Sequence, residues 1–381
     1  LRYRGFSIEL EIRDWRLEME LNELLQQGVN VEYWDISRLF YADVPLPDKV
    51  DAGFIVEISD KRDLKNRLYR EEESNTIFVI WFHCRWGTLW AYRLLFKGKF
   101  CTAFIDIGSI PMPRREDSVF IRLTELMMRG QIKRIAKAIL YRVGYYLYGL
   151  RNKSYGTVFA AGLEAVRRHE GRSHVVKINH RDYDDFLALS NSVNYQLKKN
   201  YVVFIDQYQG LHLDPILLGR RSVNPENYQR GLNKFFDLIE KRFNIDVVIA
   251  AHPKSDYQNG VFNNREIIKY KTNELVKDCE FVLGHGSTAL SFAILYRKPI
   301  MLIYNNELKN LGDSSIYPFI ETFSSVLGAA PVYNVDEVCV EEITRPSVDL
   351  EKYLQYKYEY LTSPQTEGKL TGDILFDFLC G

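Results

Sequence analysis

Short apolar runs alternate with amphipathic helical stretches along nearly the whole chain. Runs rich in β-branched and aromatic residues predict strands, and apolar positions spaced three or four apart predict helices. In the first half the predicted strands are residues 31–36, 53–58, 76–82, 100–107, 157–160 and 174–178. The predicted helices there are residues 61–71, 86–96, 122–150 and 184–189. This alternation is typical of parallel sheets whose strands are joined by crossover helices.

The second half repeats the alternation. The predicted strands are residues 201–205, 246–251, 281–283, 300–304 and 332–333, and the predicted helices are residues 225–243, 273–279, 287–296 and 349–361. The polar segment 190–200 is the best boundary between the halves. We therefore predict an α/β fold with an N-terminal Rossmann-like domain (1–190), a C-terminal Rossmann-like domain (191–348) and a helical segment (349–381). Because the chain starts at Leu1 without a methionine, we expect a preceding piece to hold the first strand.

Length and composition support a folded two-domain chain. At 381 residues the chain exceeds the usual span of one hydrophobic core. Its 50 basic and 50 acidic residues, with 46% hydrophobic residues, exclude a disordered chain, a collagen-like repeat and a polybasic nucleic-acid binder. Five scattered cysteines without a close pair fit a reducing cytoplasm, and no apolar stretch reaches the ~18 residues of a membrane span.

One segment departs from the neutral average. Residues 121–153 have a net charge of about +7 and contain four tyrosines. Two interpretations stay open. A basic aromatic helix can lie on an anionic membrane surface, which would make the protein peripheral to the membrane. It can also be a helix packed on the sheet with a solvated basic face. No nucleic-acid-binding motif accompanies the charge, so we expect no nucleic-acid partner.

Polar residues follow the predicted strands of the second half, where open α/β sheets bind ligands. After strand 281–283 come Gly284, His285, Gly286, Ser287 and Thr288, directly before a predicted helix. Small residues let a backbone approach a ligand, and hydroxyls at a helix N-terminus suit a phosphate. Taken alone, Ser287 is better explained as a helix cap.

A second polar group follows strand 246–251. His252, Pro253 and Lys254 stand there, and an imidazole fixed by the following proline can donate a hydrogen bond to a phosphate or a ribose hydroxyl. With the loop after strand 281–283, this group outlines a nucleotide pocket. No Walker lysine loop and no GxGxxG fingerprint is present, which disfavours a P-loop NTPase and an ordinary NAD enzyme.

These motifs carry a resemblance. His252-Pro253-Lys254, the loop 284–289 and the segment 297–300 (Arg-Lys-Pro-Ile) together resemble the C-terminal half of GT-B transferases that build bacterial surface polysaccharides. The resemblance covers about a hundred residues and is closest to enzymes with cytidine-nucleotide donors, namely sialyltransferases, Kdo transferases and CDP-glycerol glycerophosphotransferases. It implies a GT-B-like fold with two domains facing a cleft and a C-terminal helix that crosses back to the first domain. It also implies that His252, Ser287 and Thr288 contact the donor phosphate. Gly284-His285-Gly286 departs from the Asp-Tyr pair of the glycerophosphotransferases.

The remaining candidates concern the proton acceptor and the acceptor substrate. Sugar transfer with inversion needs a base beside the acceptor hydroxyl, and Asp206, His212 and Asp214 follow the first strand of the second half. The aspartates are equally explained as turn formers. The acceptor-side candidates are His83, Arg85, His180 and Asp182, although the acidic residues near 182 also suit a helix start.

The predicted function is that of a glycosyltransferase. We expect it to move a sugar, of the sialic or Kdo kind, from a CMP-linked donor to a bacterial surface glycan or lipid-linked acceptor. The alternatives are a glycerol- or ribitol-phosphate transferase with a CDP-linked donor and a non-catalytic nucleotide-binding subunit. We expect no cofactor and no metal, because Asp182-Tyr183-Asp184 has the spacing of a metal-binding DxD pair only by chance.

Overall fold

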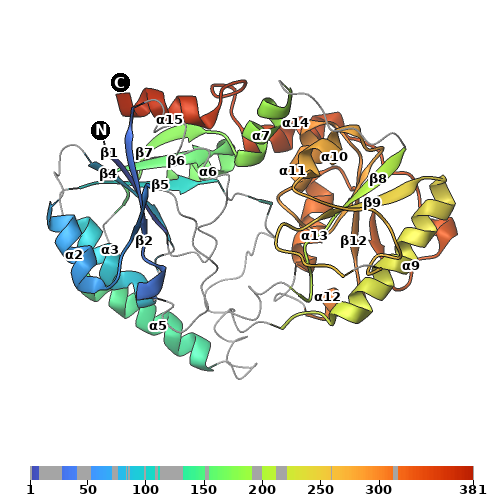
Figure 1. Cartoon of the computed structure of the whole chain (residues 1–381), viewed down its shortest axis with the longest axis horizontal. Coiled ribbons are helices and arrows are strands. Elements are labelled where there is room, and N and C mark those ends of the chain that lie inside the picture. The colour runs from blue at the N-terminus through green and yellow to red at the C-terminus, as the bar shows by residue number, and fades with distance from the viewer. Residues whose placement is uncertain are drawn as a thin grey trace. The chain divides into compact units, whose positions relative to one another are not determined.

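The computed structural model divides the chain into two compact units. Unit 1 comprises residues 1–107, 115–178 and 369–381, and unit 2 comprises residues 108–114 and 179–368. The structure describes residues 2–7, 28–40, 53–70, 76–82, 84, 86–97, 100–107, 110–111, 132–150, 154–190, 200–211, 221–258, 260–311 and 316–380. Each unit is built on a parallel sheet (Figure 1).

Unit 1 has a seven-stranded parallel sheet in the order β3-β2-β1-β4-β5-β6-β7. Its strands are β1 (Arg2–Ser7), β2 (Asn30–Asp35), β3 (Ile55–Glu57), β4 (Thr76–Trp81), β5 (Cys101–Asp106), β6 (Thr157–Ala161) and β7 (His174–Ile178). β1 pairs with both β2 and β4 at the centre of the sheet. Residues 2–7, which were not among the predicted strands, thus supply a central strand of the sheet.

Helices cover both faces of this sheet. They are α2 (Lys61–Arg70), α3 (Leu89–Lys97), α5 (Ile132–Leu147), α6 (Gly162–His169) and α15 (Thr371–Cys380), with a 3-10 turn, η2 (Trp86–Thr88), before α3. On one face, Phe78 and Ile80 of β4 join Leu64 of α2 and Leu95 of α3 in a buried cluster. On the other face, Leu375 and Leu379 of α15 are buried with side chains of β2, β4 and β6. The red C-terminal helix thus lies on the blue and green sheet of unit 1 (Figure 1), which confirms the predicted crossing back.

Unit 2 has a six-stranded parallel sheet in the order β10-β9-β8-β11-β12-β13. Its strands are β8 (Tyr201–Ile205), β9 (Asp246–Ala251), β10 (Ile267–Lys269), β11 (Val282–Gly284), β12 (Ile300–Tyr304) and β13 (Val332–Asn334). Counted within the unit, this is the 3-2-1-4-5-6 order of a Rossmann sheet. The order reverses between β8 and β11, and that reversal fixes where a ligand site can form.

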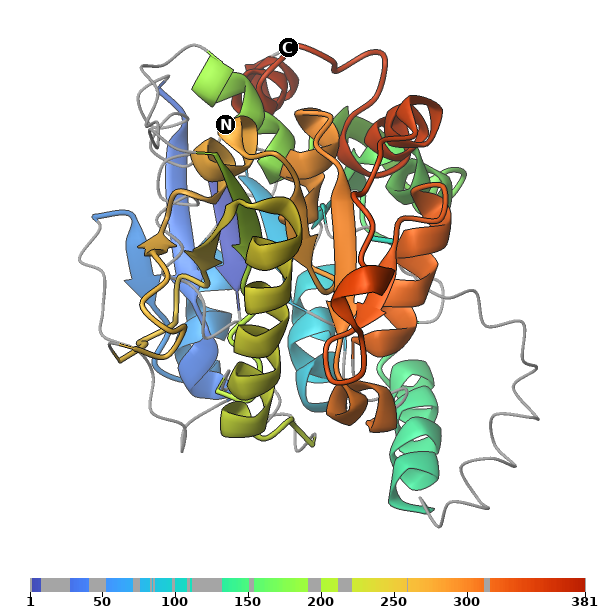
Figure 2. The same ribbon diagram turned by 90° about the vertical axis from the view of Figure 1, so that its right-hand side faces the viewer.

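The central strand β8 is buried on both faces, as its continuous apolar sequence predicts. Its side chains alternate between two clusters. Val202 and Phe204 pack on the long helix α9 (Pro225–Phe243), which lies along one face of the sheet (Figure 2). Tyr201, Val203 and Ile205 pack on the opposite face. Helices there are α7 (Arg181–Ser190), α10 (Thr272–Asp278), α11 (Leu290–Leu295), α13 (Tyr317–Val326) and α14 (Leu350–Tyr356), and α12 (Asn306–Asn310) follows β12.

The boundary between the units differs from the predicted one. The division falls at 178/179 rather than 190/191, because α7 packs on α10 and α11 of unit 2. Within unit 2, the segment after the crossing at 178/179 lies beside the segment before the crossing at 368/369. The Thr362 hydroxyl donates to Asn179 Oδ1 over 2.6 Å, and the Gly368 N–H donates to the Tyr183 hydroxyl over 3.1 Å. Among the described helices, none has the length and apolar content needed to cross a membrane.

The packing of α15 on unit 1 can be tested by mutation. Leu379 is 2% exposed, so Leu379→Ala should lower the free energy of unfolding by about 2–4 kcal/mol through lost burial and a cavity. Asp377→Ala, at an exposed position of the same helix, is the matched control and should change it by less than about 0.5 kcal/mol. Urea unfolding followed by circular dichroism measures both. Equal stability of the two variants would show that α15 does not pack as described.

Candidate active site

The carboxyl ends of four strands of unit 2 lie level with one another. Ile205 of β8 pairs with Ala250 of β9 and with Gly284 of β11, and Gly284 pairs with Leu302 of β12. Residues that follow these strands therefore emerge at one edge of the sheet, at the reversal of strand order. In open α/β sheets this edge is the ligand-binding position.

Asp206 follows β8 and is 4% exposed. Its Oδ1 accepts the backbone N–H of Tyr208 over 2.9 Å, and its Oδ2 accepts the Tyr257 hydroxyl over 2.9 Å and the backbone N–H of His252 over 3.2 Å. Burial raises the pKa of this carboxyl, and these hydrogen bonds oppose the rise. Because both oxygens are occupied by groups of unit 2, the carboxylate joins the loop after β8 to the loop after β9. This is the geometry of a positioning residue.

The loop after β9 is a tight turn. The Ser255 N–H donates to the His252 carbonyl over 2.9 Å, so residues 252–255 form a β-turn with Pro253 at its second position, where proline is favoured. His252 Nδ1 accepts the Lys254 N–H over 3.2 Å. A neutral His252 ring therefore carries its proton on Nε2, which makes Nε2 a hydrogen-bond donor. Its ring also stacks on Tyr208 with 6.5 Å between centroids.

Gly284 at the end of β11 and Gly286 after it make room for side chains of unit 2. A Cβ on Gly286 would lie 2.0 Å from Phe319 Cδ1, and one on Gly284 would lie 3.1 Å from Leu290 Cδ2. These values exclude any larger residue at 286 without movement of Phe319. The sequence analysis predicted that these glycines let the backbone approach a ligand. Packing against α11 and α13 also explains why glycine is needed at both positions.

His285 is a core residue. It is 0% exposed, its Nδ1 lies 2.6 Å from the Ile303 carbonyl, and its Nε2 is hydrogen-bonded to the Tyr228 hydroxyl. A carbonyl only accepts, so Nδ1 donates, and in a neutral ring Nε2 then accepts the Tyr228 hydroxyl. Burial lowers the pKa of His285 to about 4. The structure thus places this predicted donor-site residue between β12 and α9, away from the surface.

Ser287 and Thr288 remain at the sheet edge. Ser287 is half-buried and Thr288 is exposed. The predicted helix from 287 begins later, at Leu290, and Ser287 Oγ accepts the Ala289 N–H over 3.2 Å in the turn before it. The loop is anchored by Gln207, whose side-chain amide donates to the Gly286 carbonyl over 2.9 Å.

Sequence reasoning missed two residues that build this edge. Gln207 connects the loops after β8 and β11 through its side-chain amide. Its position just after a predicted strand could have identified it as a candidate site residue. Tyr257 reaches Asp206 from five residues beyond His252, and its ring meets Tyr208 at 5.2 Å between centroids. Nothing in the sequence pattern distinguished Tyr257 from the other tyrosines.

The predicted acceptor-side residues are only partly described. His180 and Asp182 lie in unit 2, not in the first half's domain, and both are buried at the start of α7. The Asp182 N–H donates to His180 Nδ1 over 3.1 Å, and the Ser291 hydroxyl donates to the Asp182 carboxylate, which joins α7 to α11. Burial lowers the pKa of His180. His83, Arg85, His212 and Asp214 lie outside the described residues.

No metal centre is evident in the described part of the chain, where no three His, Cys, Asp or Glu side chains group suitably. The predicted absence of a metal stays a prediction.

The positioning role of Asp206 leads to a first prediction for this site. Asp206→Asn replaces one accepting oxygen by a donor that faces a backbone N–H or the Tyr257 hydroxyl, so the free energy of unfolding should fall by about 1–3 kcal/mol. Asp256→Asn, exposed in the same loop, is the control. Chemical denaturation of the full chain measures both. Equal stability of Asp206→Asn and wild type would contradict the positioning role.

The neutral core histidine leads to a second prediction. An unfolded histidine gains its proton near pH 6.5, whereas His285 stays neutral until about pH 4. Stability is therefore lost as the pH falls through this window, by up to about 3 kcal/mol for the His285 shift. His285→Gln should remove that loss from the pH profile of unfolding, and His174→Gln, at an exposed position, should not. Parallel profiles for His285→Gln and wild type would contradict the buried neutral ring.

Comparisons with known proteins support the fold. No protein-family model matches the sequence, and no curated protein matches it. Among solved structures, the glycotransferase of kitacinnamycin is similar with a TM-score of 0.53 at 12% identity, covering 100% of this chain and 98% of that one. The glycosyltransferase VinC in complex with dTDP has a TM-score of 0.49 at 13% identity, covering 99% of each chain. The UDP-GlcNAc 2-epimerase of Methanocaldococcus jannaschii has a TM-score of 0.45 at 12% identity, covering 100% of each chain. The predicted α/β, GT-B-like fold with two Rossmann-like units is confirmed.

Proposed function

We propose that this chain is a glycosyltransferase that takes a sugar from a nucleotide donor bound at the carboxyl edge of the unit 2 sheet. The observation that carries the proposal is the joining of three strand-end loops at the reversal of strand order. Asp206 binds the loop that holds His252, and Gln207 binds the loop that leads to Ser287. Likeness of fold to a glycosyltransferase over the whole chain adds support. Fold alone does not define a reaction, so the argument depends on this edge.

The groups at this edge suit a phosphate. His252 offers a donor at Nε2, Lys254 is a cation two residues on, and Ser287 and Thr288 carry hydroxyls. When the bond between the sugar carbon and the phosphate oxygen breaks, negative charge develops on the departing phosphate. Fixed donors and a cation beside that oxygen stabilise the charge, which lowers the barrier to transfer. His252 is well suited because the turn at Pro253 and the Asp206 carboxylate both fix its backbone.

The resemblance of the His252-Pro253 motif suggests which chemical classes of donor and acceptor this site takes. It favours a CMP-linked sugar of the sialic or Kdo kind and a bacterial surface glycan or lipid-linked acceptor. Transfer of glycerol or ribitol phosphate from a CDP-linked donor is the alternative, with attack at phosphorus rather than at carbon. We assign the acceptor side to unit 1, where His83 and Arg85 follow β4 in sequence.

The base for an inverting transfer is a separate question. Asp206 was the first candidate, and its filled hydrogen bonds favour a positioning role instead. His212 and Asp214 stay candidates from the same loop. Loss of turnover in Asp206→Asn with unchanged stability and nucleotide affinity would restore Asp206 as the base.

The nucleotide site is tested by ligand binding. Thermal unfolding is followed with CMP, CDP, UDP, dTDP and GDP, and a nucleotide at about 100 times its dissociation constant should stabilise the protein by about 2.7 kcal/mol. His252→Ala should weaken the binding of that nucleotide about tenfold or more through loss of a hydrogen bond to a charged oxygen. His174→Gln, in unit 1, is the control and should bind as wild type does.

Three outcomes of this test distinguish the proposed glycosyltransferase from the alternative functions. Stabilisation by none of the nucleotides contradicts the proposal. Binding without release of free nucleotide from any sugar or polyol donor, measured by chromatography, identifies a non-catalytic subunit. Release from CDP-glycerol or CDP-ribitol, with none from sugar donors, identifies the phosphate transferase.

A further inference from the structure

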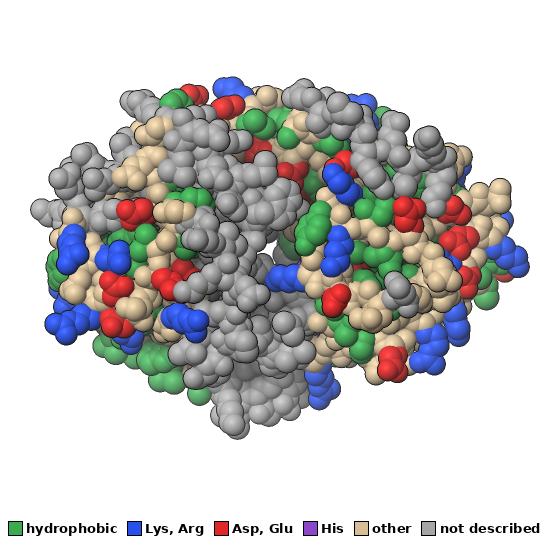
Figure 3. Space-filling view, viewed as in Figure 1, with side chains coloured by type: hydrophobic (Ala, Val, Ile, Leu, Met, Phe, Trp, Pro, Cys, Tyr) green, Lys and Arg blue, Asp and Glu red, His purple; other side chains and the backbone are tan. Residues whose placement is uncertain are grey.

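The helix α5 of unit 1 exposes a row of large apolar side chains. Of the eleven large hydrophobic residues that are exposed among those described, five lie on α5: Ile139, Leu140, Val143, Tyr146 and Leu147, at 48–69% exposure. At 3.6 residues per turn these five fall within an arc of about 120°. They form one continuous face rather than scattered exposed positions, and we call it the α5 apolar face. Figure 3 shows hydrophobic side chains along the lower edge of this unit, where Figure 1 places α5.

The opposite side of α5 is fixed on unit 1. Tyr141, Tyr145 and Tyr148 pack against its buried cluster, as does Cys84. Gly144 lets the Trp86 ring close on the helix, since a Cβ there would lie 2.5 Å from that ring. The tyrosines and Gly144 thus determine which way the helix faces, and the α5 apolar face is the side left outward. Trp86 itself is 54% exposed beside α5.

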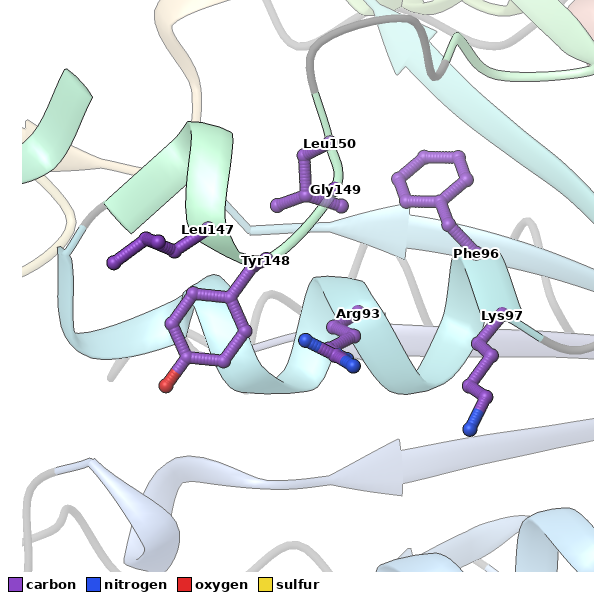
Figure 4. Close-up of a pocket in the computed structure, with 7 residues that line it drawn as sticks. All are labelled: Arg93, Phe96, Lys97, Leu147, Tyr148, Gly149 and Leu150. Atoms are coloured by element: carbon purple, nitrogen blue, oxygen red, sulfur yellow. The ribbon is translucent and has the colours of Figure 1, made fainter. Parts of the chain in front are cut away.

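Basic residues accompany the apolar face. The sequence of α5 contains four basic residues and no acidic residue. A pocket of ≈ 310 Å³ lies where α5 ends, between it and α3, and is lined by Arg93, Phe96, Lys97 and residues 147–150. Arg93 and Lys97 are exposed and one turn apart on α3, and Figure 4 shows Arg93 between Tyr148 and Lys97. Leu147 belongs both to this pocket and to the α5 apolar face.

Apolar area and positive charge side by side identify one kind of partner. An interfacial helix buries its apolar face at the boundary of headgroups and acyl chains, while cations beside it contact anionic lipid phosphates. Exposed tryptophan and tyrosine suit the same boundary. We propose that the α5 apolar face, with Arg93 and Lys97, docks unit 1 on an anionic lipid bilayer. The pocket receives a lipid phosphate, and α5 lies in the plane of the membrane.

The proposal is tested by flotation of the full chain with vesicles. Vesicles of phosphatidylcholine alone are compared with vesicles containing about 30% phosphatidylglycerol, where each contacting basic residue should add about fivefold to binding. Raising the salt from about 0.1 M to about 1 M shortens the screening length from about 10 Å to about 3 Å and should release most of the protein.

Two double variants separate the apolar and the charged contributions. Val143→Gln with Leu147→Gln should lower binding about tenfold or more, and Arg93→Gln with Lys97→Gln should lower it to a similar extent and weaken its salt dependence. All four positions are exposed, so unfolding temperatures should stay those of wild type. The matched controls are Leu350→Gln with Leu354→Gln on α14, and Arg62→Gln with Lys65→Gln on α2, which are exposed too.

Several results would overturn the proposal. These are equal flotation with neutral and anionic vesicles, loss of binding in the control variants to the same degree, or no flotation at all. Sedimentation would also overturn it if wild type is a dimer that the Val143→Gln and Leu147→Gln variant dissociates, because a second copy would then cover the face. None of these results depends on nucleotide binding, so they leave the proposed function untouched.

Discussion

The place of β8 between β9 and β11 is the constraint on which the proposed chemistry of unit 2 depends. Because the strand order reverses there, the loops that follow these strands diverge toward opposite faces and leave an edge for a ligand. Two side chains hold that edge together, since Asp206 binds the loop after β9 and Gln207 binds the loop after β11. Burying a carboxylate is unfavourable unless it is hydrogen-bonded. Loss of any of the three hydrogen bonds to Asp206 would therefore destabilise the whole group.

Three buried strands of unit 2 and its long helix could be predicted from the sequence to the residue. β8, β9, β12 and α9 match the predicted bounds, because a fully buried parallel strand is a continuous apolar run and α9 begins at an asparagine cap followed by proline. β1 could not be predicted, since Arg2–Ser7 mixes basic and apolar residues. Its place is determined by its pairing with β2 and β4, which lie far along the chain.

The candidate site could be located from the sequence but not resolved into roles. The strand-end rule identified the loops at 206, 252 and 284, and the structure brings them to one edge. Gly286 packs against Phe319, and His285 is hydrogen-bonded to Tyr228 and Ile303. These partners are distant in sequence, so the packing roles of the two residues could not be predicted. His180 and Asp182 were predicted to belong to the first domain, but the structure places them in unit 2. Their hydrogen-bond partners, Leu361 and Ser291, are in unit 2 and distant in sequence.

Hydrogen exchange of the full chain with and without bound nucleotide tests the central claim most directly. The account predicts that the nucleotide slows exchange in peptides covering residues 206–211, 252–258 and 284–289, while peptides of β4 and β5 in unit 1 are unchanged. Protection confined to unit 1, or absent from all three unit 2 loops at saturating nucleotide, would contradict it.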